Sequence, residues 1–167
     1  MDPNQNIETI DSIDKLRKLD YNNEYRLMIE NVALFNFNFL PFNISHLTVR
    51  SCNILNIFGV QNIKNLVYID ISNNPIYSIQ DLQSHHQLEV LNISNTFVVN
   101  VAVLNHLRSL KEFKSENCYI IDQQPLIRHE NYNIHWICHQ QSPTLNILQI
   151  LNPTLSETQH IGFPGNN

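Results

Sequence analysis

The chain has 167 residues, of which 10 are Lys or Arg and 15 are Asp or Glu, so its formal net charge is −5 at pH 7. This length fits one domain or one short repeat array, and 57 Leu, Ile, Val and Phe residues exclude disorder as the overall state. The acidic balance and the lack of a basic cluster argue against direct binding of nucleic acid through its phosphates. Three glycines cannot build a Gly-rich phosphate loop, and without a long apolar run or a basic N-terminal flank we expect neither a membrane span nor a secretory signal.

The cysteines indicate a reducing compartment. Cys52, Cys118 and Cys138 are odd in number and show no C-x-x-C spacing, which favours free thiols over a disulfide framework. We therefore expect a cytoplasmic chain, with the nucleus as the alternative.

Residues 1–21 are predicted to form an N-terminal helical cap. Ile10, Ile13, Leu16 and Leu19 recur every third residue among charged residues, which is typical of a short amphipathic helix. Asp11 or Ser12 is the candidate N-cap of this helix.

An internal repeat dominates the middle of the chain. Its first column, Ile44, Leu66, Leu88 and Leu110, opens four similar segments of equal length, 44–65, 66–87, 88–109 and 110–131. Columns at fixed distances from these openers are apolar in the first three segments, apart from the turn column that includes Asn74. In turn, the columns contain Leu47, Ile69, Leu91 and Phe113; Val49, Ile71, Ile93 and Ser115; Cys52, Asn74, Thr96 and Cys118; Ile54, Ile76, Val98 and Ile120; Ile57, Ile79, Val101 and Gln123; and Val60, Leu82, Leu104 and Leu126. Each segment can bury its apolar face only against its neighbours, so the segments must stack.

The same register extends upstream with a weaker match. It places Asn22, Tyr25, Leu27, Glu30, Val32 and Phe35 at core columns, and we interpret residues 22–43 as a degenerate first repeat. Residues 22–131 then contain about five repeats.

The pattern L-x-x-L-x-L-x-x-N/C-x-L, seen best in Leu66–Ile76, resembles the leucine-rich repeat family. The 22-residue length is similar to the short intracellular class of a phosphatase 1 regulatory subunit, dynein light chain 1 and the spliceosomal A-prime protein. The resemblance implies an α/β repeat solenoid with short parallel strands on the concave face, an irregular or 3-10 convex side, and helical caps. Asn74 stands at the turn position where an Asn amide satisfies main-chain groups.

Residues 132–158 are similar to the C-terminal cap of this class. The match runs from Pro143 to Glu157 and predicts a helix that begins near Ile134, where the class has Tyr; Gln149 replaces its Asp. Residues 159–167 are expected to be a flexible tail, in which Phe163 is an alternative contact for a partner.

Histidine and cysteine patterns raise two chemical alternatives. His135, Cys138 and His139 would share one helical face and offer three metal ligands, but inward packing of Cys138 explains this spacing more simply. His85, His86 and His129 are expected to be solvated on the convex side. Because Cys52 and Cys118 occupy inward turn positions, their thiols should be inert, and we expect no catalytic residue, no cofactor and no metal site.

The concave face is the candidate partner-binding surface, because residues that alternate with the buried ones on each strand face outward there. These residues are Arg26, with Glu24 and Met28 beside it; His46, Thr48 and Arg50; Tyr68, Asp70 and Ser72; Val90, Asn92 and Ser94; and Glu112, Lys114 and Glu116. Tyr68 and Arg50 are the expected anchors, and Asp70 and Lys114 the expected charge-matching positions. The alternative is an ordinary solvated face on a scaffold that binds elsewhere.

These patterns predict a non-catalytic protein-interaction module that binds a protein partner, without membrane or direct nucleic-acid contact, and that is a monomer outside its complex. A ribonucleoprotein assembly subunit that binds an RNA-binding protein is the alternative. An enzyme, which would need an exposed reactive thiol, is the third possibility.

Overall fold

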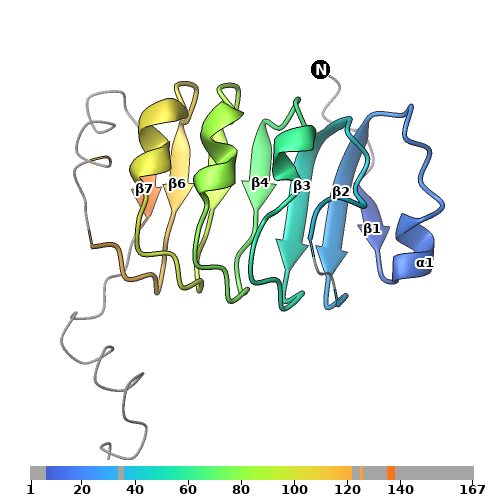
Figure 1. The fold of residues 1–167 in the computed structure, drawn as a ribbon, viewed down its shortest axis with the longest axis horizontal. Helices are drawn as coiled ribbons and strands as arrows, with labels where there is room; N and C mark the ends of the chain where they lie inside the picture. Colours follow the sequence, from blue (N-terminus) through green and yellow to red (C-terminus); the bar gives the residue numbers. More distant parts are fainter. Residues whose placement is uncertain (1–6, 34–35, 122–124, 126–134, 138–167) are drawn as a thin grey trace, which may run out of the picture.

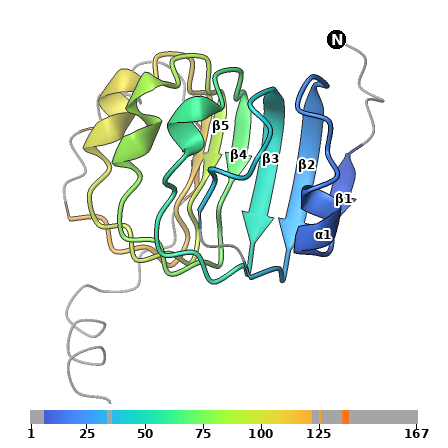
Figure 2. The same ribbon diagram turned by 45° about the vertical axis from the view of Figure 1, so that its right-hand side comes forward.

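Seven short parallel strands pair in chain order in the computed structural model of this chain, which describes residues 7–33, 36–121, 125 and 135–137. The strands are β1 (Glu8–Ile10), β2 (Tyr25–Glu30), β3 (Ile44–Arg50), β4 (Tyr68–Asp70), β5 (Val90–Asn92), β6 (Glu112–Lys114) and β7 (His135–Ile137). Across the core from this sheet lie three 3-10 helices, η1 (Val60–Asn62), η2 (Gln80–Ser84) and η3 (Ala102–His106) (Figures 1 and 2). Each turn of the chain therefore adds one strand to the sheet and, from β3 to β6, one 3-10 turn to the opposite layer.

The strand register confirms the repeat between residues 44 and 121. His46 pairs with Tyr68, Tyr68 with Val90, and Val90 with Glu112, so each step advances by one full repeat. Every described residue of the predicted columns in this range is buried, and Leu47, Ile69, Leu91 and Phe113 are fully buried in one continuous core. The stack buries apolar faces that no single repeat could cover alone.

The turn after each strand uses the left-handed backbone region at equivalent positions. The residues there are Asn31, Ser51, Asn73, Asn95 and Asn117, with φ between 52° and 57°. Asn tolerates this region better than most residues, because its short side chain hydrogen-bonds locally. Neighbouring members also contact each other, since Asn117 donates from Nδ2 to Oδ1 of Asn95 at 2.8 Å.

Asn74 satisfies main-chain groups at its turn, as its place in the pattern predicts, and it also joins two successive repeats. Its Nδ2 donates to the main-chain carbonyl oxygens of Val49, Ile71 and Ser72 at 2.8, 3.0 and 3.0 Å, and its Oδ1 accepts from the main-chain N–H of Cys52 at 2.9 Å. The side chain is buried, so these bonds satisfy main-chain groups that water does not reach.

The predicted register of the first repeat is wrong by two positions. Leu27 pairs with Leu47 and Ile29 with Val49, which is two positions short of a full repeat, after a register shift between Tyr25 and Arg26. Leu27 and Ile29 fill the core columns, whereas Glu30, which the full repeat length placed in the core, pairs with Arg50 on the outer face of the sheet. The first turn of the solenoid is thus shorter than the others.

The N-terminal segment contributes a strand as well as a helix. Ile10, expected in the helix, lies in β1 and pairs with Ile29. The helix α1 spans only Ile13–Leu16, and Ser12 is its N-cap, with the Ser12 side chain accepting from the main-chain N–H of Lys15 at 3.4 Å. Parallel pairing with β2 satisfies main-chain groups that the longer helix would have used within itself.

The C-terminal helix predicted to begin near Ile134 is not observed at 135–137. His135–Ile137 forms β7 and pairs with β6, with Trp136 opposite Phe113. The stack thus continues once more, by a step one position longer than the repeat, into the stretch expected to be a cap. The cap motif from Pro143 to Glu157 and the Phe163 tail lie outside the described residues.

Candidate functional site

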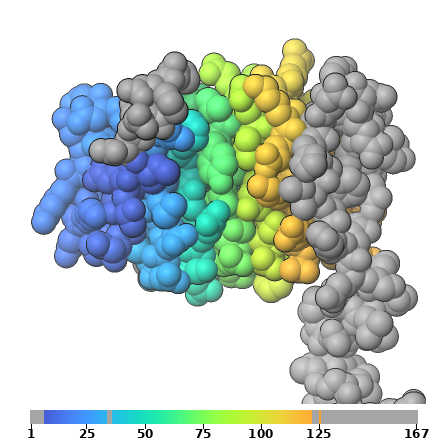
Figure 3. Space-filling view, turned by 180° about the vertical axis from the view of Figure 1, so that it is seen from behind, coloured from blue at the N-terminus to red at the C-terminus, as the bar shows by residue number. Residues whose placement is uncertain are grey.

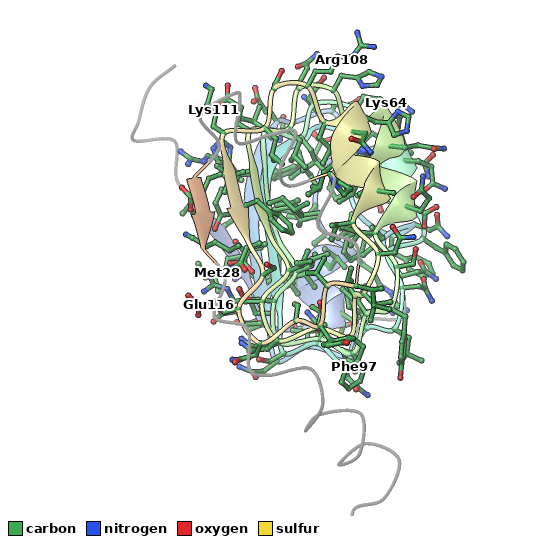
Figure 4. All side chains as sticks on the ribbon, turned by 90° about the vertical axis from the view of Figure 1, so that its left-hand side faces the viewer. Met28, Lys64, Phe97, Arg108, Lys111 and Glu116 are labelled. Atoms are coloured by element: carbon green, nitrogen blue, oxygen red, sulfur yellow. The ribbon has the colours of Figure 1, made fainter. Side chains whose placement is uncertain are left out.

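The structure brings the predicted concave-face residues together in rows across the sheet. The register aligns Arg26, His46, Tyr68, Val90 and Glu112 in one row, and Met28, Thr48, Asp70, Asn92 and Lys114 in the next. Successive repeats form successive bands on this outer face of the sheet, which Figure 3 shows directly. Figure 4, seen along the stack, places Met28 and Glu116 on the sheet side of the molecule. We call this outer sheet face the concave face.

A buried carboxylate organises the centre of the concave face. Asp70 is 0% exposed, and its Oδ2 accepts from Arg50 Nε at 3.0 Å, from Arg50 Nη2 at 2.5 Å and from Asn92 Nδ2 at 2.9 Å. The main-chain N–H and the hydroxyl of Ser72 both donate to the other oxygen, Oδ1. Burial alone would raise the pKa of Asp70, but the bonds from Arg50 and Ser72 outweigh it and lower this pKa below its ordinary value.

This geometry corrects the predicted role of Asp70. A fully buried carboxylate whose oxygens are engaged within the chain does not match a partner's charge directly; it positions Arg50 instead. Arg50 also lies 3.5 Å from the Glu30 carboxylate, so its guanidinium is held from two neighbouring strands. Ser72, Ser94 and Thr48 are buried as well. Fewer side chains of the concave face are therefore accessible to a partner than the sequence predicted.

The charges near β6 are also paired within the chain. Lys114 Nζ lies 2.5 Å from the Glu112 carboxylate, and this hydrogen bond raises the pKa of Lys114. Ser94 accepts a hydrogen bond from the main-chain N–H of Glu116 at 3.1 Å. The charges of Lys114 and Glu112, on the C-terminal half of the face, therefore compensate each other.

The N-terminal half of the concave face is hollowed. A cavity of about 310 Å³ lies between β2, β3 and β4, and it is lined on the face by Arg26, Met28, His46, Thr48, Arg50 and Tyr68. The rings of His46 and Tyr68 stack, with centroids 5.8 Å apart and planes 15° apart. Burial, followed by the nearby Arg26 charge, lowers the pKa of His46 below its ordinary value, which favours the neutral ring.

Sequence reasoning missed Glu30 and gave Met28 too little weight because it used the wrong register for the first repeat. A signal for the right register was present: Leu27, Ile29 and Val32 match the spacing of Leu47, Val49 and Cys52. That alignment assigns Arg26, Met28 and Glu30 to the concave face and removes Glu24, which precedes the strand.

The structure confirms the predicted burial of two cysteines and contradicts the predicted exposure of one histidine. Cys52 and Cys118 are buried free thiols, as expected, and burial raises the pKa of the Cys52 thiol. His85 was expected to be solvated but is buried: its Nε2 lies 3.1 and 3.0 Å from the carbonyl oxygens of Val60 and Ile63. His85 comes one repeat after Ile63 and one repeat before Leu107, and both of those residues are buried. This spacing in the sequence indicates that His85 is buried too.

The metal alternative gains no support from the part of the chain that the structure describes. Within it, no three His, Cys, Asp or Glu side chains gather as a group that could hold a metal ion. His135 lies in a strand rather than on the expected helix, and Cys138, His139 and His129 are outside the described residues. No helix among the described residues has the length and apolar character needed to span a membrane.

A second surface, not predicted from the sequence, lies at the edge where the strands end. Leu55, Tyr77, Val99 and Ile121 recur at the spacing of the repeat and are 37–70% exposed. Phe97 adds a ring 5.2 Å from that of Tyr77, and Figure 4 shows Phe97 at this edge. We call Leu55, Tyr77, Phe97, Val99 and Ile121 the apolar edge.

Comparison with known proteins identifies the fold. No family model and no curated protein sequence matches the chain. Among solved structures it is similar to internalin C2 of Listeria monocytogenes, with 19% identity, a TM-score of 0.58, and coverage of 76% of this chain and 66% of that one. It is also similar to internalin F of the same organism, with 16% identity, a TM-score of 0.44, and coverage of 71% and 46%. The chain thus spans less than two thirds of either relative's solved length. With the regular repeat register and the single parallel sheet, the likeness to internalin C2 shows that this chain has the fold of a leucine-rich-repeat solenoid.

Proposed function

We propose that this chain is a non-catalytic interaction module that binds a protein partner on its concave face, as a regulatory or assembly subunit. The observation that carries the proposal is the preordered N-terminal half of that face. There the His46–Tyr68 stack lies beside an arginine that Asp70 and Glu30 hold in place. Tyr and Arg are the residues that most often dominate binding energy at protein interfaces.

Rigidity supports the same proposal. The side chains project from paired strands, and Arg50 is already oriented by its ion pairs before any partner arrives. Association then orders fewer side chains, which lowers the entropic cost of binding. Among the described residues, Cys52 and Cys118 are buried thiols, and buried thiols fit a binding role better than a nucleophilic one.

The resemblance to the short intracellular repeat class supports a cytoplasmic or nuclear setting, and we propose a monomer outside its complex. A ribonucleoprotein assembly subunit, which binds an RNA-binding protein without contacting much RNA itself, is the alternative within this proposal. The net charge of −5 fits that indirect role.

Affinity capture from the source cells tests the proposal. Wild-type chain and a folded His46→Ala/Tyr68→Ala variant are compared by quantitative mass spectrometry, with and without nuclease treatment. We expect one protein to be enriched by the wild type and lost with the variant. RNA-binding proteins that remain captured after nuclease treatment would favour the assembly alternative, and equal capture by both chains would contradict concave-face binding.

A further inference from the structure

The cavity between β2, β3 and β4 is lined by an arginine that forms no ion pair with any described residue. Among the described residues, Arg26 forms no ion pair, and its Nε atom is buried without a hydrogen-bond partner. The other cations of the concave face differ: Arg50 is paired with Asp70 and Glu30, and Lys114 is paired with Glu112. Arg26 is therefore the concave-face guanidinium left available for a ligand.

A buried donor without an acceptor is unfavourable, because it has lost water and gained nothing in return. An incoming acceptor that reaches Nε recovers this loss, and an anion adds the attraction of opposite charges. The Nε–H and Nη–H groups of a guanidinium form a planar fork that matches the two oxygens of a carboxylate. In this chain Arg50 already uses its Nε and Nη2 atoms together on a carboxylate, with both bonds going to one oxygen of Asp70.

The other walls of the cavity limit the ligand to a small anion on an apolar stem. Met28 and Ile7 are apolar, and the His46–Tyr68 pair supplies flat aromatic surface. Because Arg26 is the one arginine of this lining that forms no ion pair with a described residue, one negative charge matches the site better than two.

We propose that the cavity beside Arg26 is a carboxylate-binding pocket that receives an acidic side chain, or a chain-terminal carboxylate, of the protein partner. The inference rests on the proposed function, because it names the chemical group that the partner inserts. It makes Arg26, rather than Arg50, the anchor for the partner's charge.

Peptide titrations followed by NMR test the pocket. The chain has five arginines, so the Arg26 Nε–Hε signal is identified by its loss in Arg26→Gln. The probes are Ac-Ala-Glu-Ala-NH2 and Ac-Ala-Ala-Ala-OH, which carry the carboxylate on the side chain and at the terminus, and the neutral Ac-Ala-Gln-Ala-NH2. We expect saturable shifts of the Arg26 signal and the Met28 methyl with one or both acidic peptides, and about tenfold weaker binding of the neutral peptide.

Two variants complete the test. Arg26→Gln is expected to weaken the acidic peptide about tenfold, and Arg26→Lys, which keeps the charge but loses the fork, to weaken it by a smaller factor. Arg108→Gln is the matched control, because Arg108 is exposed at the edge opposite Phe97 (Figure 4). Equal binding of acidic and neutral peptides, no shift at Arg26, or unchanged binding by either folded Arg26 variant would overturn the pocket. If the partner is still lost from His46→Ala/Tyr68→Ala in that case, only the pocket fails and concave-face binding stands.

Discussion

Arg50 and Asp70, one on each of two neighbouring strands, form a two-point contact in which Nε and Nη2 of the arginine share one carboxylate oxygen. The aspartate is fully buried, whereas the arginine side chain is 37% exposed. The pair therefore links the interior of the sheet to its concave face, and it fixes the position of Arg50 before binding.

Replacing Asp70 with Asn should destabilise the fold. An amide places an N–H donor where Arg50 and Asn92 already donate, and it removes the charge that compensates Arg50. We expect the free energy of unfolding to fall by about 2–3 kcal/mol, less than for a fully buried pair because Arg50 keeps part of its hydration. Urea unfolding measures this, with Glu112→Gln as the control, which breaks the more exposed pair to Lys114 and should cost under about 0.5 kcal/mol. Equal losses for the two variants would contradict the organising role of Asp70.

His85 should make stability depend on pH near neutrality. Burial lowers the pKa of His85 below its ordinary value of 6.5, so the folded state resists the proton that the unfolded state accepts. Above pH 6.5 both states are neutral and the stabilisation is fully present; it is lost as the pH falls from 6.5 towards the lower folded pKa. Unfolding free energies measured from pH 7.5 to pH 5 should fall on acidification.

Two variants separate His85 from the other histidines in that experiment. His85→Leu should flatten the profile, because the aliphatic side chain fits a column that contains Ile63 and Leu107. His86→Gln should leave the profile unchanged, since His86 is exposed. A residual slope in His85→Leu is expected from His46, whose pKa is lowered too. The same slope in His85→Leu as in the wild type would rule out His85 as the cause.

Ser51 is the odd member of the left-handed column, and Asn should be better there. Ser51 has φ 52° where Asn31, Asn73, Asn95 and Asn117 take the equivalent places. Because Ser51 is exposed, the larger side chain of Ser51→Asn meets no steric barrier, and it should raise the free energy of unfolding by about 0.5–1 kcal/mol. Asn73→Ala should lower it by about 1 kcal/mol. A thermal or urea unfolding series measures both, and a destabilised Ser51→Asn would refute the backbone argument.

Much of the fold can be predicted from the sequence because each repeat packs against its neighbours in the same way. Leu47, Ile69 and Leu91, for example, form one column of apolar residues at a fixed spacing. Each residue of such a column must face the core that it shares with its neighbours. The stacking of the segments and the burial of Asn74 and Cys52 followed from that periodicity, whereas the class of fold followed from the resemblance of the pattern to leucine-rich repeats.

The ends could not be derived in the same way, because a fixed spacing says nothing about where it changes. Paired residues of β2 and β3 are fewer positions apart in the sequence than one repeat, and those of β6 and β7 are more positions apart. Both separations depend on how these neighbouring strands pair locally. The alternation of residues along each strand predicts which side chains lie on the concave face. It does not predict which of their charges pair within the chain. Asp70 was placed on that face correctly, yet the bonds that hold it there come from side chains of the two neighbouring strands, β3 and β5, which the sequence does not bring together.

Binding measured with two matched surface variants tests the central claim most directly. The captured partner is titrated by calorimetry into wild-type chain, into the concave variant His46→Ala/Tyr68→Ala and into an apolar-edge variant, Tyr77→Ser/Phe97→Ser, after circular dichroism shows that all three are folded. Concave-face binding predicts at least about tenfold weaker affinity for the concave variant, because interface aromatics are costly to truncate, and a change within about twofold for the edge variant. Unchanged affinity for the concave variant together with a large loss for the edge variant would contradict the account and assign binding to the apolar edge.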